Sequence, residues 1–235
     1  MTHQLSKRLV FLVPVFATAA LITAAGLYFH QDFFRILPLY VSLFVLIFSA
    51  KVNRYAFLIG GLNSILYAAV YFAYGLYGMA VYAFVFSFPI QMLSFFRWKK
   101  HAYKQSVQLR KMTVRQRILV TAGFAFVWTA LYLILKSVGA AYALLDNTVS
   151  LFGILITFLQ LLAYVEYTYL MLPNSLFSVA LYIQMLPENP EQTTYLIYAL
   201  YSLVCYIFQL ALKGYGNNKI GKVLYQEKIP KPAYY

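Results

Sequence analysis

The feature that most constrains this chain is a series of long segments that contain no acidic or basic side chain. They run from Leu9 to Phe29, Ile36 to Ala50, Tyr55 to Phe96, Ile118 to Leu135, Asn147 to Val165, Tyr167 to Pro187 and Gln192 to Leu212. A helix needs about 20 apolar residues to cross a hydrocarbon core of about 30 Å. Only 11% of the 235 residues are charged and 63% are hydrophobic, whereas about 25% are charged in an average soluble domain. The sequence therefore predicts an all-α integral membrane protein.

The third segment is twice the length of one span. Gly75 and Gly78 lie near its middle, where a tight turn needs residues that tolerate unusual backbone angles, so we divide it and expect about eight transmembrane helices. The second span is short unless Phe33 and Phe34 join it and Arg35 reaches the interface. The first segment follows two basic residues, as a signal peptide does, but its apolar run is longer than a signal sequence needs.

The basic residues predict the orientation. With the N-terminus in the cytoplasm, 17 Lys and Arg residues lie inside and only Arg35 and Lys136 lie outside, as the positive-inside rule requires. An even number of spans returns the C-terminus to the cytoplasm. The loop from Arg97 to Arg117 holds eight basic residues and no acid. Topology explains this charge, with some attraction to anionic lipid, so no nucleic-acid partner is expected.

Reactive chemistry is sparse in the spans. The chain has no phosphate-binding G-x-x-x-x-G-K-[ST] loop, and its three histidines lie outside the expected spans. Asp146 and Glu166 stand at opposite ends of the sixth span, about a bilayer width apart. The single cysteine, Cys205, forms no internal disulfide. We therefore expect no catalytic residues, no metal site, no cofactor and no enzyme activity.

An internal repeat links the third and seventh spans. Asn63-Ser64-Ile65-Leu66-Tyr67-Ala68-Ala69-Val70-Tyr71 matches Asn174-Ser175-Leu176-Phe177-Ser178-Val179-Ala180-Leu181-Tyr182 at the Asn, Ser, Ala and Tyr positions. Spans four apart cross the membrane in the same direction, which predicts parallel three-helix repeats joined by a linking helix, a 3+1+3 arrangement, plus an extra N-terminal helix. Within one domain, 1–235, we expect the extra helix at 9–29, a first bundle at 33–96, a basic cytoplasmic loop at 97–117, the linking helix at 118–135, a second bundle at 144–212 and a cytoplasmic tail at 213–235.

The repeated asparagines mark the expected binding site. Asn63 and Asn174 each lie about 12 Å from the cytoplasmic edge, near the midplane where secondary transporters bind substrate. Amides that merely join helices are the alternative, at about 1 kcal/mol each. Gln91 adds an amide, and Tyr67, Tyr71, Tyr167 and Tyr182, which lie beside the asparagines, could stack on a flat ring. We expect hinges at Gly60, Gly61 and Pro173, because glycine weakens a helix and proline frees a carbonyl.

From about Asn53 to Leu212 the chain resembles the PnuC-type transporters of nicotinamide riboside, a family with thiamine-specific relatives. The resemblance is carried by Ile59-Gly60-Gly61-Leu62-Asn63-Ser64-Ile65-Leu66-Tyr67, Gly75-Leu76-Tyr77-Gly78, Pro89-Ile90-Gln91, Trp98-Lys99-Lys100, and Leu145-Asp146 leading to Glu166 and Asn174. It implies a 3+1+3 fold, often a homotrimer, that moves its substrate by facilitated diffusion while a cytoplasmic kinase traps the product. The family motif W-x-x-W-x-x-x-N is altered here, because Tyr167 and Leu170 occupy the tryptophan positions.

We therefore interpret the chain as a multi-pass protein of the bacterial cytoplasmic membrane that takes up nicotinamide riboside or a similar nucleoside-like vitamin precursor. In this interpretation Asn63, Gln91 and Asn174 bind ribose or amide groups, and Tyr67 and Tyr167 flank the ring. A nucleoside or deoxynucleoside carrier of the same fold is one alternative. A membrane scaffold that transports nothing is another, although a scaffold needs no amides at the midplane.

Overall fold

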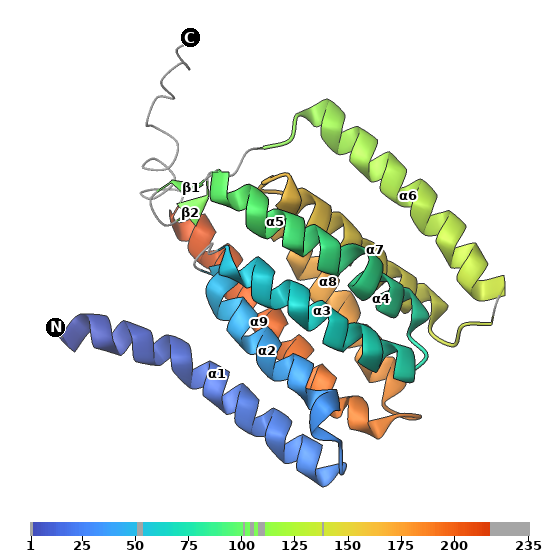
Figure 1. The fold of residues 1–235 in the computed structure, drawn as a ribbon, viewed down its shortest axis with the longest axis horizontal. Helices are drawn as coiled ribbons and strands as arrows, with labels where there is room; N and C mark the ends of the chain where they lie inside the picture. Colours follow the sequence, from blue (N-terminus) through green and yellow to red (C-terminus); the bar gives the residue numbers. More distant parts are fainter. Residues whose placement is uncertain are drawn as a thin grey trace.

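The computed structural model describes residues 2–50, 54–100, 102–103, 106–107, 111–137 and 139–216, and these are almost entirely helical (Figure 1). Counted with α4, η1 and α5 as one continuous rod, the described residues form eight helical rods. The elements in chain order are α1 (Thr2–Tyr28), α2 (Phe33–Ala50), α3 (Tyr55–Ala73), α4 (Tyr77–Val81), the π-helical segment η1 (Tyr82–Ser87), α5 (Phe88–Lys100), the short strands β1 (Ala102–Tyr103) and β2 (Ser106–Val107), α6 (Val114–Ser137), α7 (Ala143–Leu161), α8 (Tyr167–Met185), the 3-10 turn η2 (Pro190–Gln192) and α9 (Thr193–Gly216).

The double-length segment is divided where the glycines predict. Gly75 adopts a φ of 69°, and the Leu76 N–H donates to the Tyr71 carbonyl at 2.9 Å to close the end of α3. This left-handed conformation favours glycine because a Cβ makes it costly. The short second span takes in Phe33 and Phe34, so α2 reaches 18 residues. Both expectations are confirmed.

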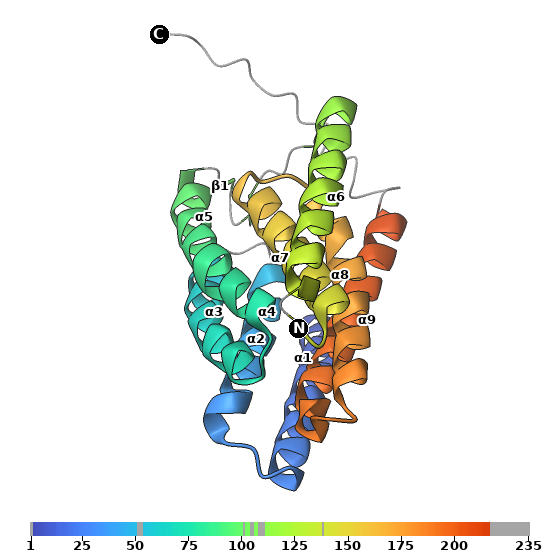
Figure 2. The same cartoon turned by 90° about the vertical axis from the view of Figure 1, so that its right-hand side faces the viewer.

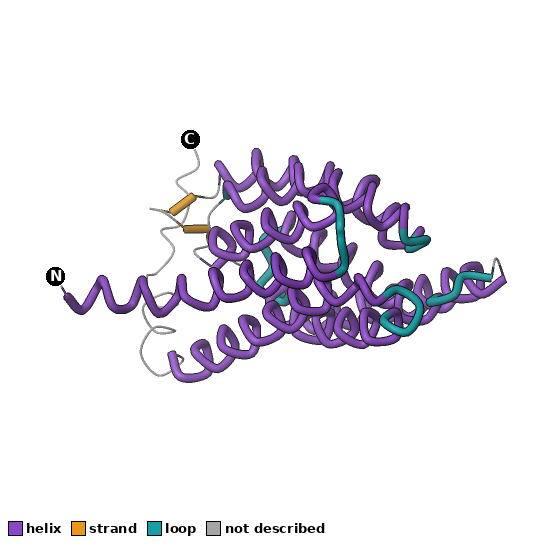
Figure 3. The backbone as a smooth tube through the Cα atoms, turned by 90° about the horizontal axis from the view of Figure 1, so that it is seen from below, coloured by secondary structure: helices purple, strands orange, loops and turns teal. Residues whose placement is uncertain are grey.

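The helices form two similar bundles. The first consists of α2, α3 and the rod from α4 to α5, and the second consists of α7, α8 and α9, with α3 and α8 as the central helices. Figures 1 and 2 show α6 lying along α7 at one edge, and α1 lying at the opposite edge, against α9 and α2. Seen from below in Figure 3, the long helices run side by side. The arrangement confirms the predicted repeats with a linking helix and an extra N-terminal helix.

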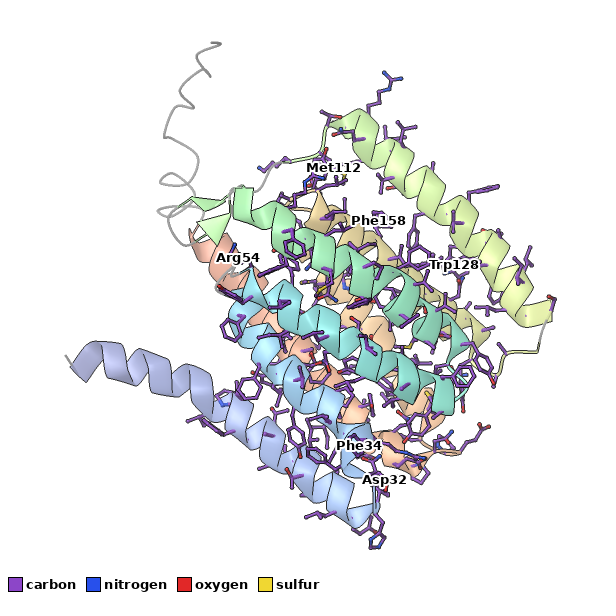
Figure 4. All side chains as sticks on the ribbon, in the orientation of Figure 1. Asp32, Phe34, Arg54, Met112, Trp128 and Phe158 are labelled. Carbon is purple, nitrogen blue, oxygen red and sulfur yellow. The ribbon has the colours of Figure 1, made fainter. Side chains whose placement is uncertain are left out.

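The two ends of the bundles differ in charge. At the end that we call the basic end, α3 begins, α5 ends and α6 begins, and this end carries Arg54, Arg97, Lys111, Arg115 and Arg117. The opposite end, the acidic end, carries Asp32, Glu188 and Glu191. Figure 4 shows Arg54 and Met112 near one end and Asp32 and Phe34 at the other. Within the described residues, four rods have the length and composition of membrane spans: α3, 77–97, α6 and α7.

Asp146 joins the two bundles at the acidic end. It lies in the first turn of α7 with only 3% of its surface exposed, and its carboxylate accepts hydrogen bonds from the backbone N–H groups of Gly78 and Met79 at 3.2 and 3.1 Å. The first N–H groups of a helix lack partners within the helix and attract negative charge. Asp146 therefore caps α4 from the neighbouring bundle. A side chain at Gly78 would lie 2.8 Å from this carboxylate, which explains the glycine.

The linking helix α6 is attached to the second bundle by polar contacts. No residue of α6 is buried. The Trp128 indole donates to the Thr148 hydroxyl at 2.9 Å, and the Asn147 amide donates to the Trp128 carbonyl at 2.9 Å (Figure 4). At the basic end, Glu166 accepts from the Arg117 guanidinium at 2.8 Å and from the Met112 N–H at 3.0 Å. These bonds hold α6 at both its middle and its start.

Several helix boundaries extend beyond the uncharged segments. The N-terminal helix begins at residue 2 rather than 9, and the linking helix spans 114–137 rather than 118–135. Basic residues do not stop a helix at the interface, because their long stems let the charge reach water. The predicted basic loop contains the two short strands, although residues 101, 104–105 and 108–110 lie outside the described residues. Of the predicted tail, α9 includes residues 213–216, and 217–235 also lie outside them.

The cap predicts a specific loss of stability. Asp146→Ala removes the acceptor for two helix N–H groups, and we expect a lower thermal unfolding midpoint in detergent, equivalent to about 1 to 2 kcal/mol. Asp146→Asn retains one acceptor oxygen and should lose less. Asp32→Ala, which removes an exposed carboxylate at the same end, is the matched control. Equal midpoints for the Ala variants at 146 and 32 would contradict the role of Asp146.

Candidate functional site

A cavity of about 290 Å³ lies between the two bundles. Pockets that bind small molecules begin at about this size. Both bundles contribute amides, hydroxyls and rings to its wall. Its amides are Asn63, Gln91, Gln160 and Asn174, and its tyrosines are Tyr67, Tyr71, Tyr82, Tyr182, Tyr195, Tyr198 and Tyr206. The lining extends to Ala56 and Phe57, in the first turn of α3 at the basic end.

Asn63 is held firmly in the wall of the first bundle. Its side-chain nitrogen donates to the Pro38 carbonyl and to the Ser42 hydroxyl, both at 2.9 Å, and only 3% of the residue is exposed. A carbonyl only accepts hydrogen bonds, so the amide orientation is fixed by chemistry. The side-chain oxygen of Asn63 is buried and has no partner. The arrangement leaves a hydrogen-bond acceptor free for a bound molecule.

Asn174 provides the counterpart in the second bundle. It lies on α8, directly before the buried Ser175, as Asn63 lies on α3 directly before the buried Ser64. Its side-chain oxygen is also buried without a partner. A buried polar atom that lacks a hydrogen bond costs about 1 to 3 kcal/mol. Two such acceptors in one cavity favour a ligand that offers N–H or O–H donors.

Gln91 forms hydrogen bonds to two serines in the wall. Its side-chain nitrogen donates to the hydroxyls of Ser64 and Ser87 at 3.1 and 2.6 Å, and these two hydroxyls are 2.8 Å apart. Ser64 donates in turn to the Gly60 carbonyl at 2.9 Å. The network joins α3, the π-helical segment η1 and α5. Gln91 therefore lines the cavity and also fixes the positions of its neighbours.

Tyrosine rings close the cavity toward the acidic end. Tyr67 stacks on Tyr71 with ring centroids 5.2 Å apart. Tyr195, which is 1% exposed, meets Tyr67 and Tyr182 with centroid distances of 6.3 and 5.7 Å. Its hydroxyl donates to the Arg35 carbonyl at 2.7 Å and so joins α9 to α2. The two bundles therefore contact each other at this end through tyrosines.

The wall of the cavity carries no charge. Among the part of the chain that the structure describes, no Lys, Arg, His, Asp or Glu lines it. The same part contains no group of three or more His, Cys, Asp or Glu side chains that could hold a metal ion. The wall offers amides, hydroxyls and aromatic faces. These groups suit a flat ring that carries hydroxyl or amide substituents.

The structure brings together four of the five residues that the sequence predicts for the site. Asn63, Tyr67, Gln91 and Asn174 all line the cavity. Tyr167 does not line it and lies in a separate apolar cluster with Met112, Ile156 and Leu159. Leu170 and Met171 pack against this cluster, and Met171 itself lines the cavity. Tyr167 therefore supports the wall from behind.

The predicted hinge residues lie inside unbroken helices. α3 continues through Gly60 and Gly61, and α8 continues through Pro173. A Cβ at Gly60 would collide with the Gln91 side-chain oxygen, and one at Gly61 would lie 2.5 Å from the Met92 methyl carbon. Both glycines thus permit close packing of α3 on α5. Their role as hinges stays a prediction.

Sequence reasoning missed much of the aromatic wall. On α9, Tyr195, Tyr198, Ser202 and Tyr206 follow one another at helical spacing of three or four residues and all line the cavity. That periodicity is visible in the sequence. Tyr82 and Ser87 lie in the π-helical segment, which no simple sequence pattern reveals.

Comparisons with known proteins indicate the family and the fold of the chain. Residues 32–215 match the family model described as nicotinamide mononucleotide transporter. A nicotinamide riboside transporter PnuC of Neisseria mucosa is 29% identical over 180 residues, which cover 73% of this chain and 65% of that protein. The chain thus spans slightly less than two thirds of that relative. The crystal structure of the vitamin B3 transporter PnuC has a TM-score of 0.67 at 20% identity and covers 84% of this chain and 90% of that one, which shows a shared fold.

The two asparagines are expected to differ in their effect on stability. Asn63→Ala leaves the Pro38 carbonyl and Ser42 without their donor, so it should lower the free energy of unfolding by about 1 to 3 kcal/mol. Asn174→Ala removes an oxygen that has no partner, and it should lower stability by much less. Thermal unfolding of both variants without ligand tests this expectation. Equal losses in the free energy of unfolding would show that the Asn63 hydrogen bonds do not stabilise the protein.

Proposed function

The chain belongs to the nicotinamide mononucleotide transporter family, and on this basis we propose that it carries nicotinamide riboside, or a closely related nucleoside-like vitamin precursor, across a bacterial cytoplasmic membrane. The proposed mode is facilitated diffusion. A cytoplasmic kinase then phosphorylates the transported substrate and so traps it in the cell. One observation carries the proposal: Asn63 and Asn174, from matched repeats, line one uncharged cavity, and each has a side-chain oxygen without a hydrogen-bond partner. A ribose and a carboxamide supply the donors that these oxygens lack.

The lack of charged side chains among the described residues of the cavity wall favours the riboside over the mononucleotide. A phosphate group carries negative charge, and burying it without a positive partner costs several kcal/mol. Among the described residues, no Lys, Arg or His lines the cavity. The nicotinamide ring of the riboside is positively charged, and such a ring is attracted to the faces of tyrosines. The wall thus suits the riboside better than its phosphorylated form.

Each predicted site residue has a proposed role. Asn63 and Asn174 accept hydrogen bonds from the substrate, and Tyr67 offers a ring face. Gln91 borders the substrate and holds Ser64 and Ser87 in place. Tyr167 acts indirectly, since it packs behind Met171 in the wall. The two bundles rock against each other, and the weak points of their helices at Gly60, Gly61 and Pro173 accommodate the movement.

A nucleoside or deoxynucleoside carrier is the second candidate. Among the described residues, no carboxylate lines the cavity to pair with a positively charged ring, which suits a neutral nucleoside. The two tryptophan positions of the family motif also hold Tyr167 and Leu170. Membership of a transporter family sets the scaffold alternative aside.

The first test is a calorimetric titration of the detergent-purified protein with nicotinamide riboside, thiamine and a panel of nucleosides. We expect binding of nicotinamide riboside, and labelled riboside should exchange across proteoliposome membranes. Asn174→Ala should weaken binding by about tenfold, since a hydrogen bond of about 1.4 kcal/mol is lost. Leu176→Ala, an exposed position on the same helix, is the control.

The outcomes separate the candidates. Tight binding of a neutral nucleoside and none of nicotinamide riboside would transfer the proposal to the second candidate. An Asn174→Ala carrier that exchanges riboside at the normal rate would remove this residue from the site. No binding of any ring-bearing ligand would overturn transport of this substrate class.

The assembly is proposed from the family resemblance, which implies a homotrimer. The apolar side chains of α6 remain exposed in a single chain and are available to lipid or to neighbouring copies. Light scattering of the purified protein gives the mass of the assembly. A mass equal to one chain would contradict the trimer.

The proposed orientation places the basic end and both termini in the cytoplasm, because basic residues are retained on that side. Cys205 is free, so Cys205→Ala gives a background for labelling single cysteines. In intact cells, Asp32→Cys should react with a membrane-impermeant maleimide and Arg115→Cys should not. Both should react after the membrane is permeabilised. The opposite pattern in intact cells would invert the topology.

A further inference from the structure

The π-helical segment η1 turns two side chains toward the cavity. Tyr82 and Ser87 stand at its two ends, five residues apart, and both line the cavity. In an α-helix, with 3.6 residues per turn, residues five apart point about 140° away from each other. A π-helix bonds residue i to residue i+5, so residues five apart lie on the same face. The segment therefore places a ring and a hydroxyl on one wall.

A glycine of the other bundle receives the Tyr82 ring. A Cβ at the buried Gly153 of α7 would lie 2.6 Å from the Tyr82 Cζ and 2.8 Å from its Cε1. Real contacts are not this short, so any side chain at position 153 displaces the ring. We call this contact the Gly153 notch. This contact between the two bundles holds the Tyr82 ring in one position.

The far end of η1 is fixed as well. Ser87 accepts from Gln91 at 2.6 Å and lies 2.8 Å from the Ser64 hydroxyl. The segment is thus held by a glycine of α7 at Tyr82 and by polar groups of α3 and α5 at Ser87. A ring held in this way loses little freedom when a ligand stacks on it, and such a ring binds more strongly.

We propose that Tyr82, positioned by the π-helical turn and the Gly153 notch, is the ring that determines substrate specificity in this cavity. In the family motif two tryptophans enclose the substrate ring, but the residues at these positions here, Tyr167 and Leu170, do not line the cavity. Another ring must therefore contact the substrate. Tyr82, a residue outside the family motif, supplies a stacking face in addition to that of Tyr67. This inference rests on the proposed function, because it concerns the same cavity.

The experiment uses matched glycine substitutions. Gly153→Ala forces the Tyr82 ring to move, whereas Gly123→Ala on α6 adds a Cβ that meets no atom within 4 Å. Stacking on an aromatic side chain is worth about 1 to 3 kcal/mol, so we expect Gly153→Ala to weaken nicotinamide riboside binding by at least fivefold. The ratio of its Kd to that of adenosine should change as well. Gly123→Ala should bind as the unsubstituted protein does.

A double-mutant cycle shows whether the glycine acts through the ring. Tyr82→Leu removes the stacking face, and the further change Gly153→Ala should then weaken binding by less than about twofold. Tyr82→Phe keeps the face and should lose less affinity than Tyr82→Leu. Phe84→Leu, an exposed position in the same segment, is the control for changes in η1. If Gly153→Ala does not fold, the Tyr82 and Phe84 variants decide the question.

The results distinguish this inference from the proposed function. If the unsubstituted protein binds riboside while Tyr82→Leu keeps the same affinity and selectivity, Tyr82 is not the specificity residue and the proposed function stands. A lower unfolding temperature with an unchanged Kd ratio would show a purely structural role and would also overturn the inference. Failure of the unsubstituted protein to bind any ring-bearing ligand overturns both.

Discussion

The structure depends on one constraint, which is that a bilayer offers no water to hydrogen-bond the backbone. Every N–H and C=O group in the hydrocarbon core must find a partner within the protein, so each span is a helix. Departures from the α-helix are tolerated only where protein surrounds them. Here the chain breaks at Gly75, and the Asp146 carboxylate accepts hydrogen bonds from the first N–H groups of the helix that follows, α4. The π-helical turn at Tyr82–Ser87 borders the cavity between the bundles. The irregular backbone of the first bundle is thus concentrated where it meets the second bundle.

The same constraint explains the chemistry of the cavity. Charges are costly at this depth, and the described wall contains amides and hydroxyls instead. Most of these groups satisfy one another, as in the network of Ser64, Ser87 and Gln91. The side-chain oxygens of Asn63, Asn174 and Ser202 are exceptions, since each is buried without a partner. These three unpartnered oxygens stand in an uncharged wall, and in the proposed carrier they would bind the hydroxyl and amide groups of the substrate.

The sequence predicted most of the fold because spans, turns and repeats leave local signals. Uncharged length predicted the helices, and Gly75 predicted the break. The two Asn-Ser pairs predicted the central helices and two of the four amides in the wall of the cavity. Tyr167 was predicted from the family motif, in which it occupies a tryptophan position before Asn174, but in the structure it lies in the apolar cluster with Met112 and Ile156 and does not line the cavity. Tyr82 could not be placed because a π-helical turn rotates the chain relative to an α-helix. The capping role of Asp146 and the Gly153 notch depend on contacts between distant segments, which no local pattern encodes.

The contacts at the acidic end bear on how the proposed carrier would open. Asp146 bonds to α4 and Tyr195 bonds to α2, so each joins the two bundles, and tyrosine rings fill the space between them. The lining reaches the first turn of α3 at the other end. Opening the acidic end requires these hydrogen bonds to break, at about 1 kcal/mol net for a neutral bond and more for one to a carboxylate. The total is a few kcal/mol, which thermal motion and substrate binding can supply. In the proposed carrier these bonds would therefore be strong enough to hold the bundles together at this end and weak enough to exchange during transport.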